Sequence, residues 1–227
     1  MAGREVEPRV EAGLRRQLEE WRRLLGEGAE RLGWKIGFNA PKAQEALGIS
    51  EPVIGFLTSA TAIEPGGRHS LAGAQKPLVE VEVAIELRRP VGPGAAVDEA
   101  LAAIESLGVA IELIDMPRPP DDLEQALAGN VFHRGVVFGP YRQDAAVGGI
   151  TATISVSGEE RESAPADVDL ADTIRLVADL LAAGGERLEA GDRIIAGTLT
   201  PPVPVAPGDE VQVDLGPLGR TGLSLTG

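Results

Sequence analysis

The sequence predicts a single α+β domain in which β structure dominates. Many short segments are continuously apolar or alternate between apolar and polar residues, and glycine- and proline-rich turns separate them. Only a few segments show the three-to-four-residue apolar period of an amphipathic helix. The chain has 227 residues, 43% of them hydrophobic and 3% aromatic, so one mostly aliphatic core is expected. We therefore expect strands with two or three helices packed against them.

The first helix is predicted over residues 8–32. Apolar residues recur every three to four positions between Val10 and Leu25, arginine and glutamate fill the positions between them, and Gly33 ends the pattern. The predicted organisation is a helical N-terminal segment, 1–32, followed by the main domain, 33–227, which is expected to carry any functional site.

The remaining elements follow from periodicity and from their boundary residues. Asp98 and Asp169 are predicted helix N-caps, and Gly48 and Gly184–Gly185 are predicted helix ends. In chain order we expect a strand at 34–38, a helix at 41–47, an extended stretch after Pro52, a surface excursion at 58–75, a strand at 76–88, a helix from Asp98 to Leu107, a strand at 108–115, a proline-rich loop, a helical turn at 122–127, strands at 135–141 and 150–158, a helix after Asp169, and strands in the C-terminal remainder.

Composition excludes several classes of function. The formal net charge of -14 argues against nucleic acid and anionic membranes as partners, because both require clustered positive charge. There is no cysteine, which excludes disulfides and thiolate chemistry. No apolar run approaches the roughly 20 residues of a transmembrane helix, and the charged N-terminus does not resemble a secretory signal. The expected compartment is the cytoplasm.

Common catalytic motifs are absent from the sequence. No GxSxG motif supports a serine hydrolase, and no glycine-rich nucleotide-binding loop occurs. The two histidines, His69 and His133, have no pattern around them. We expect His133 to be an ordinary polar residue rather than a catalytic base.

The carboxylates of the segment 76–88 are the main candidates for chemistry. In a strand, Glu80, Glu82 and Glu86 share one face, and Val79 to Leu87 supply the apolar other face at alternate positions. One interpretation is an ordinary half-exposed strand with its glutamates in water. The other is a divalent cation bound by Glu80 and Glu82, since Mg²⁺ prefers oxygen ligands.

Glu112 is a third candidate ligand for such a cation. It lies in the otherwise apolar segment 108–115, and an isolated charge in a buried strand requires a partner. A neighbouring strand could bring it to Glu80 and Glu82. Spacing alone leaves both interpretations open.

The order of several motifs resembles the 2-keto-4-pentenoate hydratase family of the fumarylacetoacetate hydrolase superfamily. This family includes 2-oxo-hept-4-ene-1,7-dioate hydratases and 4-oxalocrotonate decarboxylases. The resemblance runs from about residue 33 to the C-terminus and depends on the combination of motifs. Its segments are GWKIGFNAPKAQEALGISEPVIGFL (33–57), KPLVEVEVAIEL (76–87), VAIELID (109–115) and GDRIIAGTLTPPVPVAPGD (191–209).

The resemblance implies a fold and a set of functional residues. The implied fold is a mixed β-sheet roll of the fumarylacetoacetate hydrolase type with flanking helices. The implied metal is Mg²⁺ or Mn²⁺, and Glu86 is expected to face solvent. The implied residues are Glu80, Glu82 and Glu112 as metal ligands, Lys35 as a catalytic acid, base or substrate partner, and Gly197 and Thr198 near the substrate carboxylate; Asn130 is a weaker candidate for substrate binding.

The resemblance also implies an activity. The expected reaction is the addition of water to a 2-hydroxy-2,4-dienoate of the 2-keto-4-pentenoate type, during degradation of aromatic compounds. The alternatives are a 4-oxalocrotonate-type decarboxylase, an acylpyruvate C–C hydrolase, or a non-catalytic homologue that binds a 2-oxo acid. A homo-oligomer is expected, and a bound cation would attract an anionic substrate despite the net negative charge.

One departure from the family pattern affects the expected activity. Hydratases of this family commonly carry an acidic residue directly after the proline of a P-x-x-G segment. Here that segment carries Val53 and Ile54 instead. If the acid positions water, its absence weakens the hydratase prediction while leaving metal binding intact.

Overall fold

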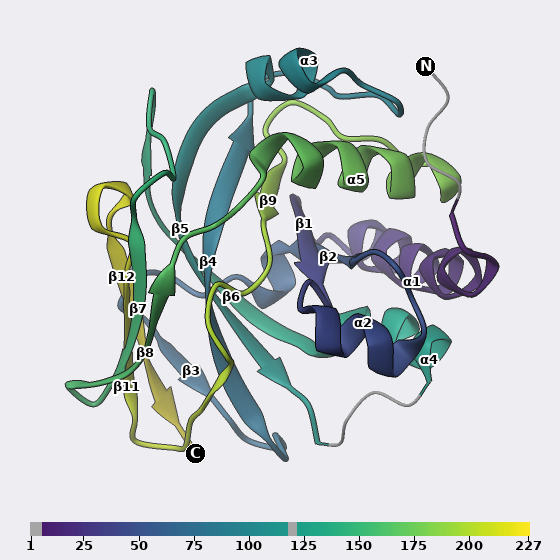
Figure 1. Cartoon of the computed structure of the whole chain (residues 1–227). Coiled ribbons are helices and arrows are strands. Elements are labelled where there is room, and N and C mark those ends of the chain that lie inside the picture. The colour runs from purple at the N-terminus through teal and green to yellow at the C-terminus, as the bar shows by residue number, and fades with distance from the viewer. Residues whose placement is uncertain (1–5, 118–121) are drawn as a thin grey trace.

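Two β-sheets and the helices that flank them form the molecule. The computed structural model describes residues 6–117 and 122–227. The larger sheet has the strand order β2-β1-β9-β4-β5-β6, with β10 added beside β4, and the smaller has the order β3-β12-β11-β7-β8. In Figure 1 the smaller sheet lies at the left, and α1, α2 and α4 lie at the right, across the long curved strands β4 and β5. The α+β, strand-rich fold and the mixed sheets predicted from the sequence are confirmed.

The helices and strands have the following bounds. The helices are α1 (Pro8–Gly26), α2 (Pro41–Leu47), α3 (Val97–Ala102), α4 (Leu123–Ala128) and α5 (Leu170–Ala183), with short 3-10 turns η1 (Ser59–Thr61), η2 (Asn130–Phe132) and η3 (Gly216–Leu218). The strands are β1 (Arg31–Gly37), β2 (Val53–Thr58), β3 (Arg68–Ser70), β4 (Pro77–Leu87), β5 (Ile104–Asp115), β6 (His133–Arg142), β7 (Thr151–Val156), β8 (Glu159–Pro165), β9 (Arg193–Ile195), β10 (Val203–Pro204), β11 (Glu210–Asp214) and β12 (Arg220–Thr226).

The larger sheet curls until its two edges meet. The chain leaving β2 returns to the opposite edge strand β6, where Ala62 forms a parallel bridge with Val136. The Ile63 amide donates to the Val136 carbonyl at 2.8 Å. Because of this curl, one face of the sheet becomes an interior with its own small apolar cluster. Its fully buried members are Leu57, Ala84, Ala110, Val136 and Ile195.

Two predicted helices are confirmed together with their boundary residues. Helix α2 ends at Gly48, whose left-handed φ of 64° explains the glycine. Helix α5 begins after Asp169, whose carboxylate accepts a hydrogen bond from the Asp172 amide at 2.8 Å. These boundaries are encoded locally, which is why the sequence could predict them.

The N-terminal helix is shorter than predicted. Helix α1 ends at Gly26, and strand β1 begins at Arg31 rather than at residue 34. Strand β1 pairs with both β2 and β9, so ladder hydrogen bonds take residues that periodicity assigned to the helix.

The third helix is also shorter, and the strand after it begins earlier than predicted. Helix α3 ends at Ala102, its N-cap is Ala96 rather than Asp98, and β5 begins at Ile104 rather than at residue 108. Residues 104–107 pair with the end of β4, and this pairing outweighs their local helical pattern. The predicted surface excursion, 58–75, likewise contains β3, which pairs with β12.

Helix α1 packs against the sheet and shares the main core. The Gln17 side chain is fully buried and donates to the Ile54 carbonyl of β2 at 3.0 Å and to the Leu127 carbonyl of α4 at 2.8 Å. Leu14 and Leu18 are also buried in this core. The division at residue 32 into a helical segment and a catalytic domain stays a prediction.

Candidate metal centre

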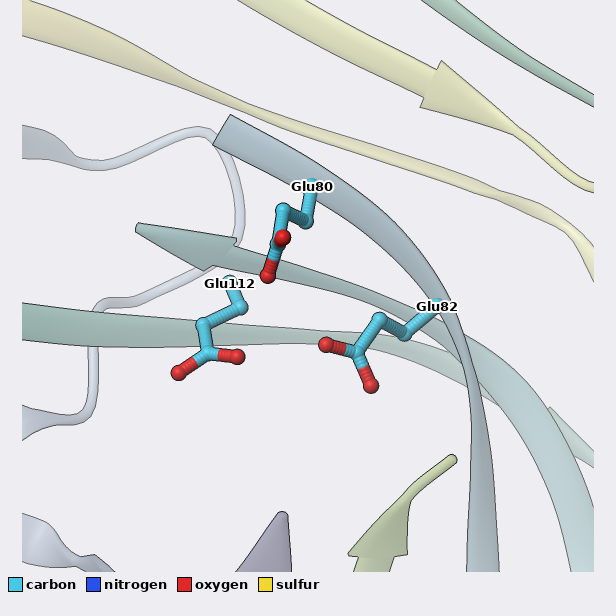
Figure 2. A group of neighbouring side chains, drawn as sticks. All are labelled: Glu80, Glu82 and Glu112. Atoms are coloured by element: carbon cyan, nitrogen blue, oxygen red, sulfur yellow. The ribbon is translucent and has the colours of Figure 1, made fainter. Parts of the chain in front are cut away.

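Three glutamates meet on the inner face of the curled sheet. Strands β4 and β5 are antiparallel, with Glu80 directly opposite Glu112, and Glu82 is two residues further along the same face of β4. Figure 2 shows the three side chains turned toward one another from the two strands. One oxygen from each carboxylate lies within 4.8 Å of the other two. The structure therefore brings together the three residues that the sequence singled out.

The face that carries these glutamates is buried. Glu82 and Glu112 are 0% exposed, and Val79, Val81 and Val83 on the opposite face of β4 are also 0% exposed. The half-exposed interpretation of residues 76–88 is therefore wrong for Glu82. It failed because periodicity reports which residues share a face but not what covers that face.

Glu86 lies on the same inner face but has a different partner. Its carboxylate accepts a hydrogen bond from the Ser106 hydroxyl of β5 at 2.7 Å, and it is half-buried. The expectation that Glu86 faces only solvent is therefore corrected.

Each fully buried carboxylate uses one oxygen inside the protein and leaves the other without a partner. Glu82 Oε2 accepts the Gly197 amide at 2.6 Å, and Glu112 Oε1 contacts Lys35 Nζ at 2.7 Å. Glu82 Oε1 and Glu112 Oε2 are buried and have no hydrogen-bond partner among the described residues. Buried carboxylate oxygens without partners are strongly unfavourable unless a cation or a proton binds them. The residues present therefore fit a hard divalent cation.

The protonation equilibria of the three carboxyls reflect their crowding. Burial, followed by repulsion from Glu112, raises the pKa of Glu80 to about 8. Burial and the same repulsion raise the pKa of Glu82 well above its ordinary value. Burial opposes ionisation of Glu112 too, but Lys35 and His133 outweigh it and lower the pKa of that carboxyl. With all three carboxyls ionised and Lys35 charged, the cluster would carry a net charge of -2, which a bound 2+ ion would balance.

Lys35 enters the site from β1 with its side chain fully enclosed. Besides Glu112, its Nζ donates to the Val131 carbonyl at 3.2 Å. Burial alone would lower the pKa of Lys35, but the charges of Glu112, Glu80 and Glu82 outweigh it and raise that pKa.

Gly55 on β2 provides the room for the lysine stem. A Cβ at this position would lie 2.8 Å from Lys35 Cγ and 2.7 Å from Asn130 Oδ1. The glycine of the P-x-x-G segment is therefore required by close packing behind Lys35.

Asn130 supports the site through the backbone of β2. Its Nδ2 donates to the Phe56 carbonyl at 2.9 Å, and its Oδ1 accepts the Phe56 amide at 2.8 Å. Both polar atoms of the Asn130 amide are thus engaged with the backbone of β2, and a substrate-binding role for Asn130 stays a prediction.

A left-handed turn begins at Asn130. Asn130, Val131 and Phe132 have φ values of 53°, 52° and 64°, a strained conformation for residues other than glycine and most of all for β-branched valine. The turn directs the Val131 carbonyl to Lys35 and places Phe132 on the wall of the adjoining pocket.

The loop containing Gly197 and Thr198 borders the glutamates. Gly197 has a φ of 94°, and a Cβ on it would lie 2.7 Å from Asn39 Cγ. The Asn39 side chain donates to the Thr198 carbonyl at 3.0 Å, which fixes the loop. Thr198 lines the pocket beside Glu80. Gly197 reaches the cluster through the hydrogen bond that its backbone amide donates to Glu82.

A pocket of about 270 Å³ opens onto the cluster. Lys35, Glu80 and Thr198 mark its polar end. Most of its other described lining is apolar, with Phe38, Ile114, Met116, Val131, Phe132 and Pro202 among these residues. The site thus combines a charged end with an apolar chamber, which suits a small acid with a hydrocarbon chain.

Val53 is buried in β2 and pairs with Gly37 of β1. It carries no group that could bind or orient water, and it is not among the residues that line the pocket. The structure therefore gives Val53 no part in positioning water.

His133 was not predicted to belong to the site. Its Nδ1 lies 2.8 Å from Glu112 Oε1, its Nε2 lies 3.0 Å from Thr61 Oγ1, and its side chain is 1% exposed. The sequence did indicate that Glu112, a charge in an apolar strand, needs a partner, and His133 is one such partner. Nothing in the local sequence identified which one.

The fold and the buried acidic cluster define a class of strand-rich enzymes whose site lies inside a curled sheet. The chain belongs to the fumarylacetoacetate (FAA) hydrolase C-terminal family, whose model matches residues 29–224. The family predicted from the sequence is confirmed.

Several characterised proteins are similar over most of their length. A 4-oxalocrotonate decarboxylase from Pseudomonas sp. is 33% identical over 93% of this chain and 87% of its own. The 2-oxo-hept-4-ene-1,7-dioate hydratase of Escherichia coli is 31% identical over 88% of this chain and 81% of its own. The structure of the 4-oxalocrotonate decarboxylase from Pseudomonas putida G7, complexed with magnesium and adipate, superposes with a TM-score of 0.85 at 26% identity over 92% of this chain and 83% of that chain.

The relatives thus include both hydratases and decarboxylases, and the chain is a member of an enzyme family that contains both. Within the described residues, no helix is long and apolar enough to cross a membrane.

Proposed function

We propose that this protein is a divalent-metal-dependent enzyme acting on a small 2-oxo or 2-hydroxydienoate acid, with Mg²⁺ or Mn²⁺ as cofactor. The observation that carries the proposal is the pair of buried, unpartnered oxygens of Glu82 and Glu112 beside Glu80. The magnesium and adipate bound to the decarboxylase from Pseudomonas putida G7 support it.

In this proposal each part of the site has a distinct role. Glu80, Glu82 and Glu112 hold the cation, which when bound would polarise the 2-oxo group of the substrate. Gly197 and Thr198 border the substrate carboxylate. The hydrocarbon chain of the substrate occupies the apolar part of the pocket.

Lys35 is the proposed catalytic group of the chain itself. Its ammonium has three donors, of which Glu112 and the Val131 carbonyl take two. The third is free to meet substrate in the pocket that Lys35 lines. A lysine held charged there stabilises negative charge on the substrate and can donate a proton.

Decarboxylation of a 2-oxo diacid is the reaction we favour. The bond to the remote carboxylate breaks, its electron pair delocalises toward the 2-oxo oxygen, CO₂ leaves, and a proton returns to the product. An apolar chamber assists this reaction because it disfavours the charged carboxylate that is lost. It requires no group to position water, which agrees with Val53.

Hydration of a 2-hydroxy-2,4-dienoate is the second candidate. Similarity to the Escherichia coli hydratase, at 31% identity, favours it. In this reaction water adds across a carbon–carbon double bond and must be oriented by a polar group. Among the described pocket residues, Lys35 and Glu80 are the charged groups that could do so.

Parallel substrate assays test the proposal. The purified protein is given 2-oxohex-3-enedioate or 2-hydroxypenta-2,4-dienoate, with Mg²⁺ or with EDTA, and substrate absorbance and CO₂ release are followed. We expect Mg²⁺-dependent CO₂ release from the diacid. Loss of the dienoate without CO₂ would instead favour the hydratase.

Two other outcomes would replace both candidates. Cleavage of an acylpyruvate would indicate a C–C hydrolase, and cation binding without turnover of any 2-oxo acid would indicate a non-catalytic binding protein. The cytoplasmic location and the homo-oligomeric assembly stay predictions.

A further inference from the structure

Glu112 is held by two side chains that approach the same oxygen. Lys35 Nζ lies 2.7 Å and His133 Nδ1 lies 2.8 Å from Glu112 Oε1, so Oε2 is the atom left for a cation. The terminal torsion of a glutamate is broad, and a single contact leaves the carboxylate plane free to rotate. Two donors from different strands, β1 and β6, fix that plane.

His133 is itself held by Thr61, next to the bridge between Ala62 and Val136 where the edges of the curled sheet meet. Its Nε2 lies 3.0 Å from Thr61 Oγ1, and the Thr61 hydroxyl also contacts the Thr58 carbonyl at 3.3 Å. Thr61 directly precedes Ala62, which bridges to Val136 of β6. The same closure that buries the inner face therefore orients the imidazole.

The two contacts determine which ring nitrogen of His133 donates a hydrogen bond to Glu112. An ionised Glu112 carboxylate can only accept, so Nδ1 must carry hydrogen and donate to Oε1. The Thr61 hydroxyl can accept from or donate to Nε2 and thus satisfies the second ring nitrogen. The imidazole has no ring nitrogen left for a substrate, and His133 is not among the residues that line the pocket.

We propose that His133, fixed by Thr61, is a positioning residue that aims Glu112 Oε2 at the cation and thereby sets the affinity of the centre for Mg²⁺. This inference rests on the proposed metal-dependent function. Glu82 provides the parallel case, because the Gly197 backbone amide fixes its second oxygen at 2.6 Å. Partners of metal ligands of this kind typically change metal affinity by 10- to 100-fold when they are removed.

The test measures Mg²⁺ binding by titration calorimetry, without substrate, on four variants of the 227-residue chain. His133→Leu removes the donor to Glu112, and His133→Asn keeps an amide donor near the position of Nδ1. Thr61→Val removes the hydroxyl that holds Nε2. His69→Asn is the matched control, because His69 lies on β3 of the other sheet.

We expect His133→Leu to bind Mg²⁺ about 10- to 100-fold more weakly than the wild type. His133→Asn should recover most of this loss, Thr61→Val should show a smaller loss, and His69→Asn should show none. Recovery of affinity by asparagine distinguishes positioning from simple packing, because asparagine does not restore the ring volume.

Wild-type affinity in folded His133→Leu would overturn the inference while leaving the proposed metal site in place. If His133→Leu does not fold, the inference would be overturned by two results together. These are wild-type Mg²⁺ affinity in Thr61→Val and a loss of about 10- to 100-fold in His133→Asn. If the wild type itself binds no Mg²⁺, the proposed function fails as well, so the two failures are distinguishable.

Discussion

Strands β4 and β11 are written with the same alternation but have opposite environments. In β4, Glu82 alternates with valines and is 0% exposed. In β11, Glu210 and Gln212 alternate with Val211 and Val213, and both polar side chains are exposed. The difference lies outside the strands, because β4 belongs to a sheet whose edges meet and β11 to one whose outer face stays open. Period-2 patterning therefore cannot by itself separate a functional face from a solvated one.

The largest expected effect is the loss of metal affinity when an inner carboxylate is neutralised. Glu82→Gln can still accept the Gly197 amide, but it directs an NH₂ group at the cation position. We expect Mg²⁺ affinity, measured by calorimetry, to fall by more than about 100-fold. Glu210→Gln on β11 is the matched control and should leave the affinity unchanged. Equal affinities for both variants would erase the functional difference between the two faces.

Metal removal should lower the stability of the folded protein if the cation binds at the inner face of β4. A cation that binds the folded state at about 100 times its Kd adds about 2.7 kcal/mol to the free energy of unfolding. For a chain of this size that corresponds to a rise in Tm of about 5–10 °C, measured by calorimetry in Mg²⁺ and in EDTA. We expect the rise in the wild type and in Glu210→Gln but not in Glu82→Gln. A rise that persists in Glu82→Gln would place the stabilising cation elsewhere.

A methyl group on the inner face should disturb catalysis, whereas one at the surface should not. In Gly55→Ala the new Cβ would crowd Lys35 Cγ and Asn130 Oδ1, at 2.8 and 2.7 Å. Displacement of Lys35 should lower kcat by about 10- to 100-fold in the assay described above. Gly148→Ala is the control, because nothing lies within 4 Å of its new Cβ. Normal kcat in Gly55→Ala would show that the position of Lys35 is not critical.

The smallest effect is expected at Glu86, near the C-terminal end of β4 and beyond the cluster of three glutamates. Glu86 accepts a hydrogen bond from Ser106 at 2.7 Å and is half-buried. Glu86→Ala should lower the free energy of unfolding by about 1 kcal/mol in urea titrations, because that bond is lost. Its Mg²⁺ affinity should remain that of the wild type. Weakened Mg²⁺ binding would extend the functional face along the whole strand.

The sequence predicted those features that depend on neighbours in the chain. Gly48 and Asp169 mark helix ends through local backbone geometry, and the alternation around Glu80 and Glu82 placed both on one face. The isolated charge of Glu112 in an apolar segment marked it as a third candidate ligand, and the family resemblance added Lys35, which the structure places 2.7 Å from Glu112.

The remaining features depend on closure of the sheet and left no local signal. Burial of the inner face follows from the bridge between Ala62 and Val136. His133 reaches Glu112 only because β6 pairs beside β5, and its sequence neighbours carry no motif. The left-handed conformation of Val131 contradicts its residue type, so only the surrounding structure could specify it.

The bond network of Gln17 bears on how this protein can be divided or recombined. The family match begins at residue 29. The Gln17 side chain on α1, which precedes it, nevertheless donates hydrogen bonds to two buried carbonyls, one of them on Ile54 beside Gly55. A chimera that exchanged α1 for the helix of a relative would leave those carbonyls unpaired unless the incoming helix carried a donor at the position of Gln17. Helix α1 and strand β2 are therefore coupled through the Gln17 side chain, and the packing behind Lys35 depends on a helix that precedes the family match.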